Sequence, residues 1–307
     1  MNLFDEPYCL LPTASRERVW VHESYQDRLA AHGFRALKDF LDPEQISDKT
    51  ERPGRSLYRL SLPGSDGVET VYLKIHRRIG FRKAWEEMAD FRKPRSKGLA
   101  EMENLLWFRS VGVDTAFPIA AGERKVLGIE TVSFLLTRSV EPYVCLWDRL
   151  DELGGGRSEG NLFREKCRLS RAVASTLSRL HQAGIVYPGF LAKHVYVEPD
   201  VEGDRLPGIC LLDLKKPLRE GRPLSRGPLR DLANFMTSLG PRFVTNADRF
   251  RFVCHYKEYG GPAGGETFRS LVEAILGLAE RLRGRDVSRF RNFFAGKFVD
   301  PPRSDSR

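Results

Sequence analysis

One stretch of this chain, from Leu162 to Asp213, constrains the fold more than any other. It opens with apolar residues at the spacing of one helix face, namely Leu162, Leu169, Val173, Leu177 and Leu180. Gly184 follows as a typical helix stop, and a short loop runs from Tyr187 to His194. Two apolar segments come next, and Asp213 stands directly after the second. The pattern predicts a long buried helix, a loop and two short strands that end at a carboxylate.

The two halves of the chain differ in their hydrophobic periodicity. Strands are expected in the first half over 17–23, 57–62, 68–75, 116–121, 125–127 and 132–136, with one helix over 100–111. Helices are expected in the second half over 162–180, 229–239 and 268–278. The sequence therefore predicts an α+β protein. Residues 1–140 would form an N-terminal extension and a small β-rich lobe, residues 141–300 a larger α-helical lobe, and residues 301–307 a disordered tail.

Composition narrows the classes of partner. No run of roughly 18 apolar residues occurs, so no transmembrane helix is expected. The N-terminus lacks a basic region followed by an apolar one, and the five cysteines lie far apart, so a cytoplasmic protein with reduced thiols is expected. The net charge of +9 favours acidic partners such as nucleotides or anionic lipids. Nucleic acid is not expected as a partner, because no helix-turn-helix, zinc-finger or aromatic sheet motif is present.

Residues 76–98 form a basic segment that carries interleaved aromatic side chains. Such a segment is either a mobile arm that faces phosphate or membrane, or simply a solvated insertion. The sequence leaves both interpretations open.

Several candidate residues would suit the transfer of a phosphoryl group from ATP. That reaction needs a cation on the nucleotide phosphates and carboxylates that hold Mg²⁺. Lys74 lies on the strand over 68–75, on the face opposite Val71, Leu73 and Ile75. A glutamate of the helix over 100–111 would hold this lysine; Glu101 is the first choice and Glu103 the competitor.

Two more candidates lie in the second half of the chain. Asp213, directly beyond a buried strand, is well placed to hold Mg²⁺. His194 stands where a second metal ligand would be, although imidazole binds Mg²⁺ less well than an oxygen ligand does.

The order of these residues resembles the lipopolysaccharide kinase (Kdo/WaaP) family, a branch of the protein-kinase-like fold. The likeness covers roughly residues 55 to 240 and depends on Lys74, the turn 112–115, the loop ending in His194, Asp213-Leu214 and Asp231 within Arg-Asp-Leu-Ala. The resemblance implies a cytoplasmic enzyme that uses ATP and Mg²⁺. Its substrate would be an inner-core heptose or Kdo hydroxyl on an anionic glycolipid, reached by peripheral contact at the inner membrane. It also implies that Lys74, Glu101 and Asp213 bind the nucleotide, that Asp213 and His194 hold the metal, and that Asp231 braces the loop.

The chain departs from the family pattern at two places. Gly189 occupies the position of the catalytic aspartate, and glycine can neither accept a proton nor orient a hydroxyl. Gly64 and Gly67 are the only glycines of the turn interpreted as covering the phosphates, so a glycine-rich motif is absent there. Three hypotheses follow: a glycolipid kinase that lacks the usual base, a pseudokinase that binds nucleotide or a partner, and an unrelated basic α+β protein.

Overall fold

The computed structural model describes residues 7–43, 48–64, 67–77, 96–126, 129–154, 159–214, 217–219, 226–261, 272–275 and 277–278. The chain divides into two compact units, and each is described by itself. Unit 1 comprises the chain up to Ser110 together with Thr115–Glu141. Unit 2 comprises Val111–Asp114 and the chain from Pro142 onward. Helices and strands are both well represented, so the predicted α+β class is confirmed.

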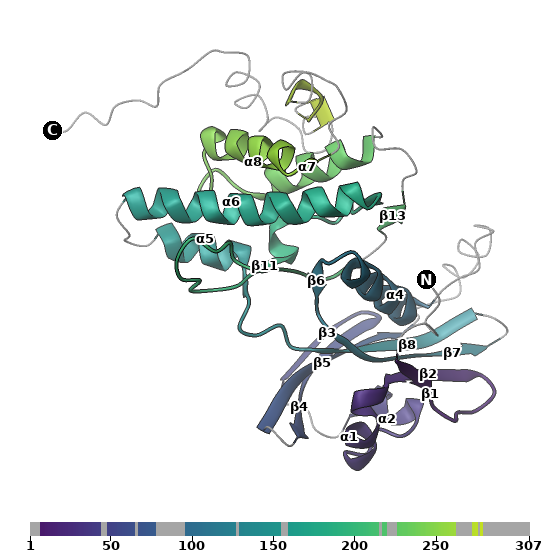
Figure 1. Ribbon diagram of the computed structural model, residues 1–307. Coiled ribbons are helices and arrows are strands. Elements are labelled where there is room, and N and C mark those ends of the chain that lie inside the picture. The colour runs from purple at the N-terminus through teal and green to yellow at the C-terminus, as the bar shows by residue number, and fades with distance from the viewer. Residues whose placement is uncertain are drawn as a thin grey trace. The chain divides into compact units, whose positions relative to one another are not determined.

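Unit 1 is built on a seven-stranded sheet in the order β1-β2-β7-β8-β5-β4-β3 (Figure 1). Its strands are β1 (Tyr8–Leu10), β2 (Glu17–His22), β3 (Asp48–Arg52), β4 (Arg55–Gly64), β5 (Gly67–Arg77), β7 (Pro118–Val126) and β8 (Ile129–Arg138). Each pair of neighbouring strands is antiparallel. In the middle of the sheet, β5 lies between β4 and β8, so the strand that carries Lys74 is supported on both sides.

The two faces of this sheet are covered by different helices. On one face, Leu29, Leu37 and Phe40 from α1 (Gln26–Ala31) and α2 (Leu37–Leu41) join alternate strand residues in the hydrophobic core. The short helix η2 (Glu23–Tyr25) leads into α1. The opposite face is packed by α4 (Lys97–Ser110), which contacts β5, β7 and β8 (Figure 1). Alternation along β5 therefore directs Leu73 and Ile75 into the core and Lys74 toward α4.

Two details of this sheet differ from the expected pattern. The strand β3 was not predicted, because all five of its residues are exposed and it has no apolar alternation. The segments expected as separate strands over 116–121 and 125–127 are one strand, β7, whose pairing with β8 shifts register between Arg124 and Lys125. Irregular pairing of this kind interrupts the two-residue period on which strand prediction depends.

Unit 2 is mainly helical. Its helices are α5 (Leu146–Gly154), α6 (Glu159–Gln182), α7 (Arg226–Ser238) and α8 (Asn246–Glu258), and α6 packs against α8 (Figure 1). The predicted stripe of α6 is buried at Leu169, Val173, Leu177 and Leu180. The short strands are β9 (Val144–Cys145), β11 (Val195–Val197) and β12 (Ile209–Leu211), which pair in the order β12-β11-β9, and β10 (Ile185–Val186), which pairs with β13 (Leu218–Arg219). The strand β6 (Asp114–Thr115) spans the boundary between the units.

Some expected segments lie outside the described residues. They are most of the basic segment 76–98, residues 268–271 and 276 of the helix expected over 268–278, and the tail 301–307. The described residues of that helix, 272–275 and 277–278, are helical. Among the residues that the structure does describe, no helix is both long and apolar enough to cross a bilayer.

Candidate functional site

The candidate residues of unit 1 form an ion pair between Lys74 and Glu101. The Lys74 ammonium on β5 contacts Oε1 of Glu101 on α4, and the two side chains are only 13% and 7% exposed. The structure thus pairs Lys74 with the glutamate that the sequence favoured over Glu103. Limited access to water strengthens the attraction between the charges and restricts the lysine to one direction. A lysine held in this way is suited to contact the phosphates of a nucleotide.

Gly98 allows α4 to approach the sheet closely enough for this pair to form. A Cβ atom at Gly98 would overlap the carbonyl oxygen of Phe134 on β8. The Gly98 N–H donates to the Ser133 hydroxyl at 3.1 Å, which ties the first turn of α4 to the same strand. Glu101 lies one turn further along α4, so the close contact at Gly98 positions its carboxylate. The sequence gives no indication of this contact, because a glycine near a helix start carries no distinctive signal.

In unit 2, the loop after α6 is held by one face of α7. The buried Asp231 carboxylate accepts a hydrogen bond from the Tyr187 N–H and contacts His181 Nε2 at 3.2 Å. The Asn234 side chain donates to the Pro188 carbonyl at 2.9 Å. Asp231 therefore contacts the loop backbone, as the resemblance implied.

A third hydrogen bond joins α7 to the loop, and Asp231 itself is buried. The Ser238 hydroxyl accepts from the Ala192 N–H at 2.8 Å. Asn234 and Ser238 were missed, although their spacing from Asp231 places all three on one helix face. Burial raises the pKa of Asp231 above its usual value and outweighs the opposing effect of His181.

The loop position expected to hold a catalytic base is shaped by Tyr187. A Cβ atom at Gly189 would lie 2.7 Å from the Tyr187 ring and hydroxyl, which is closer than van der Waals contact allows. The Tyr187 hydroxyl in turn donates to the backbone carbonyl of Asp213 at 2.7 Å. The phenol therefore occupies the space beside Gly189 and anchors the residue that carries the candidate metal-binding carboxylate. Tyr187 is a further site residue that the sequence analysis did not identify.

His194 and Asp213 lie together in unit 2, with His194 Nε2 3.8 Å from Asp213 Oδ2. His194 Nδ1 lies 3.0 Å from the carbonyl oxygen of Gly189, and because a carbonyl only accepts, Nδ1 carries the proton. In the neutral ring, Nε2 then carries the lone pair. Asp213 has φ of +58°, a left-handed conformation that non-glycine residues seldom adopt and that is concentrated at functional sites.

This pair fits a divalent cation of the kind that kinases use. A carboxylate oxygen and an imidazole nitrogen supply two ligands, and Mg²⁺ typically fills its other positions with water and phosphate oxygens. Across the described parts of the chain, no cluster of three or more histidine, cysteine or acidic side chains is arranged to hold a metal by itself.

The interpretation of Gly64 and Gly67 as the phosphate-covering turn does not fit the register of the sheet. Lys74 pairs with Leu57, whereas Gly64 and Gly67 pair at the other end of the β4–β5 hairpin. At about 3.4 Å per residue, this turn lies on the order of 24 Å from Lys74 along the strand. The turn between β3 and β4 is much nearer, because Arg55 pairs with His76.

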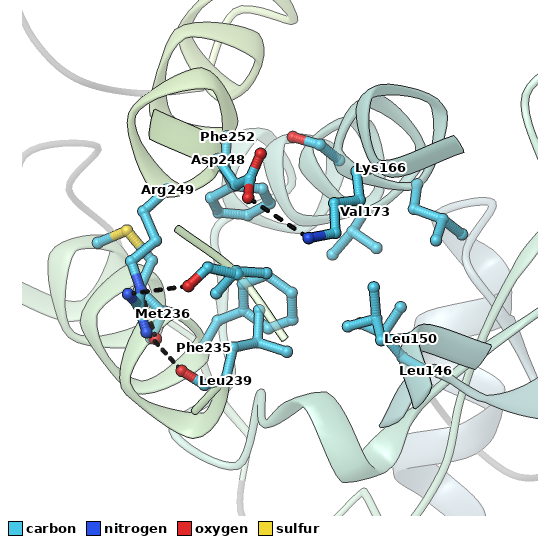
Figure 2. Close-up of a pocket in the computed structure, with 13 residues that line it drawn as sticks. Leu146, Leu150, Lys166, Val173, Phe235, Met236, Leu239, Asp248, Arg249 and Phe252 are labelled. Atoms are coloured by element: carbon cyan, nitrogen blue, oxygen red, sulfur yellow. Dashed lines mark hydrogen bonds and ion pairs between the residues drawn. The ribbon is translucent and has the colours of Figure 1, made fainter. Parts of the chain in front are cut away.

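An apolar cavity of about 50 Å³ lies elsewhere in unit 2, among α5, α6, α7 and α8 (Figure 2). Leu146, Leu150, Phe235 and Phe252 contribute to its lining, and Lys166 contacts Asp248 at 3.8 Å beside it (Figure 2). None of the candidate phosphate or metal residues lines this cavity. It is therefore separate from the pair formed by His194 and Asp213.

The chain is similar to known proteins in sequence and in fold. The family model described as the lipopolysaccharide kinase (Kdo/WaaP) family matches residues 47–256. The lipopolysaccharide core heptose(I) kinase WaaP of Escherichia coli is 24% identical over 189 residues, which are 61% of this chain and 70% of that protein. A solved structure of WaaP in complex with acyl carrier protein has a TM-score of 0.58 and 22% identity, covering 86% of this chain and 97% of that one. Since the family model spans more than half of its length, this chain belongs to the lipopolysaccharide kinase (Kdo/WaaP) family.

Proposed function

We propose that this protein is an ATP-dependent phosphotransferase that phosphorylates a sugar hydroxyl of an anionic glycolipid. The family supports a lipopolysaccharide core as the acceptor, and the heptose kinase among the relatives supports a heptose or Kdo residue of the inner core. The enzyme would work in the cytoplasm, with peripheral contact at the inner membrane surface. The net charge of +9 suits an anionic membrane-bound substrate.

One observation carries this proposal more than any other: the conformation of Asp213. Its left-handed backbone is anchored by the Tyr187 hydroxyl, and its carboxylate faces His194. Strained backbone conformations cost on the order of 1–3 kcal/mol, so they persist where the surrounding structure enforces them. A carboxylate and an imidazole held beside each other in this way support a role in cation binding.

The remaining site residues would bind and orient. Lys74, fixed by Glu101, would neutralise charge on the nucleotide phosphates, and Asp213 with His194 would hold the cation. Asp231 would keep the loop backbone in place through the Tyr187 N–H. Bound Mg²⁺–ATP supplies the phosphoryl group and the positive charge that stabilises its transfer.

The missing base limits the rate and leaves the reaction chemically possible. General-base catalysis contributes on the order of 10²–10⁴-fold. Phosphoryl transfer passes through a loose transition state and depends mainly on positioning and electrostatic stabilisation. A slow kinase is therefore compatible with glycine at position 189.

A pseudokinase is the second candidate function, and the packing at Gly189 favours it. Because the Tyr187 ring fills the space beside Gly189, a carboxylate side chain at this position would have to displace the ring. A protein of this kind would keep Lys74, Glu101 and Asp213 for nucleotide binding, or would bind a partner, without turnover.

A thermal-shift titration with ATP tests the proposal, because a ligand that binds the native state raises its melting temperature. Wild-type protein is compared with Lys74→Ala and Asp213→Asn, with Mg²⁺ or Mn²⁺ present or chelated. We expect a metal-dependent rise in melting temperature that both substitutions abolish.

The other outcomes separate the alternatives. A rise that does not depend on metal and survives Asp213→Asn would remove the cation site from the proposal. The absence of any shift at millimolar ATP would contradict both the kinase and a nucleotide-binding pseudokinase, leaving a partner-binding module.

A further inference from the structure

Tyr256 of α8 carries a hydroxyl that is enclosed within unit 2. The residue is 0% exposed, and its phenol oxygen lies 2.8 Å from Nδ1 of His181 on α6. The His181 ring is also buried and meets the tyrosine ring edge to face, with the ring centroids 5.6 Å apart. A buried hydroxyl without a partner costs free energy, so this contact satisfies both groups.

The hydrogen-bonding capacity of the two groups determines the direction of this contact. Among the described residues, His181 is the only hydrogen-bond partner of the Tyr256 hydroxyl. If Nδ1 carried a proton, it would donate to the phenol oxygen, and the phenol hydrogen would be buried without an acceptor. The hydroxyl therefore donates to Nδ1, and His181 is neutral with its proton on Nε2.

The proton on Nε2 faces Asp231. His181 Nε2 lies 3.2 Å from Oδ2 of Asp231 on α7, and the Tyr187 N–H donates to the same oxygen. The other carboxylate oxygen, Oδ1, is buried and has no hydrogen-bond partner in the part of the chain that the structure describes. Oδ2 thus accepts from two donors, and the loss of one would leave the buried carboxylate with a single hydrogen bond.

Tyr187 connects this group to the candidate cation site. Its N–H is bound by Asp231, and its hydroxyl donates to the backbone carbonyl of Asp213 at 2.7 Å. A displacement of the Asp231 carboxylate would therefore move the backbone of Tyr187 and the phenol that anchors Asp213. A continuous series of hydrogen bonds thus runs from Tyr256 to the residue whose carboxylate would bind the cation.

We propose that Tyr256 is a positioning residue for the Mg²⁺–ATP site. Its hydroxyl holds the His181 ring with Nε2 toward Asp231, which keeps Tyr187 and hence Asp213 in place. In Tyr256→Phe, Nδ1 loses its partner in a buried position, so the ring is no longer restricted to this orientation. The inference rests on the proposed cation site at Asp213 and adds α8 to the elements that support it.

Other contacts attach α8 to α6, so the hydroxyl can be removed without detaching the helix. The two helices pack against each other (Figure 1). The Ser178 hydroxyl and the Gln182 side chain each donate to the Tyr259 carbonyl at 2.7 Å. Tyr259→Phe is the matched control, because it keeps these backbone contacts and removes the same atom from a residue that is 37% exposed.

Calorimetric binding of ATP to the full-length protein, with Mg²⁺ present or chelated, tests the inference. We expect Tyr256→Phe to weaken Mg²⁺–ATP binding about fivefold, as for the loss of one hydrogen bond, and metal-free ATP binding by less than about twofold. Metal-free ATP is spared because its binding does not use the Asp213 carboxylate. Tyr259→Phe should change neither affinity.

NMR of protein with ¹⁵N-labelled histidines gives a readout that a general loss of stability would not produce. We expect His181 in the neutral Nε2–H form in the wild-type protein, with its signals identified by their absence in His181→Gln. The ¹⁵N shift of Nδ1 should change in Tyr256→Phe, because its hydrogen bond is lost, and should stay the same in Tyr259→Phe.

Several results would overturn the inference. A proton on Nδ1 of His181 in the wild-type protein would contradict the direction of the hydrogen bonds. Equal loss of Mg²⁺–ATP and metal-free ATP binding in Tyr256→Phe would indicate a general structural effect, and unchanged Mg²⁺–ATP binding would show that the hydroxyl does not position the site. A wild-type protein that binds ATP neither with nor without Mg²⁺ would contradict the proposed function as well.

Discussion

At the residue scale, the feature that bears most directly on the proposed activity is the packing of Tyr187 against Gly189. The sequence shows that the base is missing, but it does not show that its space is filled. The phenol lies where a side chain at position 189 would begin, and it holds the Asp213 carbonyl at 2.7 Å. The same tyrosine thus supports the candidate cation site and obstructs a carboxylate side chain at position 189.

We therefore expect Gly189→Asp alone to give no gain in phosphate transfer. The new side chain must displace Tyr187, which should lower the free energy of unfolding by about 1–3 kcal/mol. The double substitution Tyr187→His with Gly189→Asp makes room for the carboxylate and keeps a ring N–H that can donate to the Asp213 carbonyl in place of the phenol, so we expect it to raise turnover on the order of 10²-fold. Urea denaturation and a steady-state ADP-release assay measure the two effects. Full activity in Gly189→Asp with unchanged stability would contradict the packing argument.

Candidate site residues could be named from the sequence where a pattern isolates them. Lys74 alternates with buried neighbours on its strand, and Asp213 directly follows a buried strand. Both could therefore be named as candidates. The interaction of Lys74 with Glu101 followed from the position of the glutamate on its helix. Tyr187, Asn234 and Ser238 could not be found, because their importance comes from contacts with residues far away in the chain.

At the scale of secondary-structure elements, prediction succeeded where hydrophobic periodicity is strong. The buried stripe of α6 and the alternation along β5 both appear as expected. The exposed strand β3 was missed because it has no apolar face, and α8 because its composition is mostly polar. Thr245 and Asp248 form a capping box at the start of α8, and this signal could have revealed the helix.

The close approach of α4 to β8 leads to a stability prediction. Gly98→Ala should lower the free energy of unfolding by about 1–3 kcal/mol, because the added methyl group overlaps the Phe134 carbonyl. It should also weaken ATP binding, since α4 carries Glu101. Gly160→Ala is the matched control: its helix position is open, and alanine there should stabilise by about 0.5–1 kcal/mol. Equal effects of the two substitutions in urea denaturation would contradict the proposed contact.

At the scale of the whole molecule, the order of elements carried the prediction of the fold. Strands and one helix come first, and a mainly helical part follows, which is the pattern of a protein-kinase-like chain. The sequence could not reveal which hairpin turn lies near Lys74, because strand order and register depend on pairing between distant segments. For this reason the turn with Gly64 and Gly67 was interpreted as covering the phosphates, although the turn between β3 and β4 lies nearer to Lys74.

The central claim is that the whole protein transfers phosphate to a core sugar. The most direct measurement is a single-turnover reaction with excess enzyme, ATP, a divalent cation and a lipopolysaccharide acceptor whose inner core lacks phosphate, analysed by mass spectrometry. We predict that the acceptor gains the mass of one phosphate with wild-type protein and gains none with Asp213→Asn. An unmodified acceptor, under conditions in which the wild-type protein binds ATP, would contradict the claim and identify the protein as a pseudokinase.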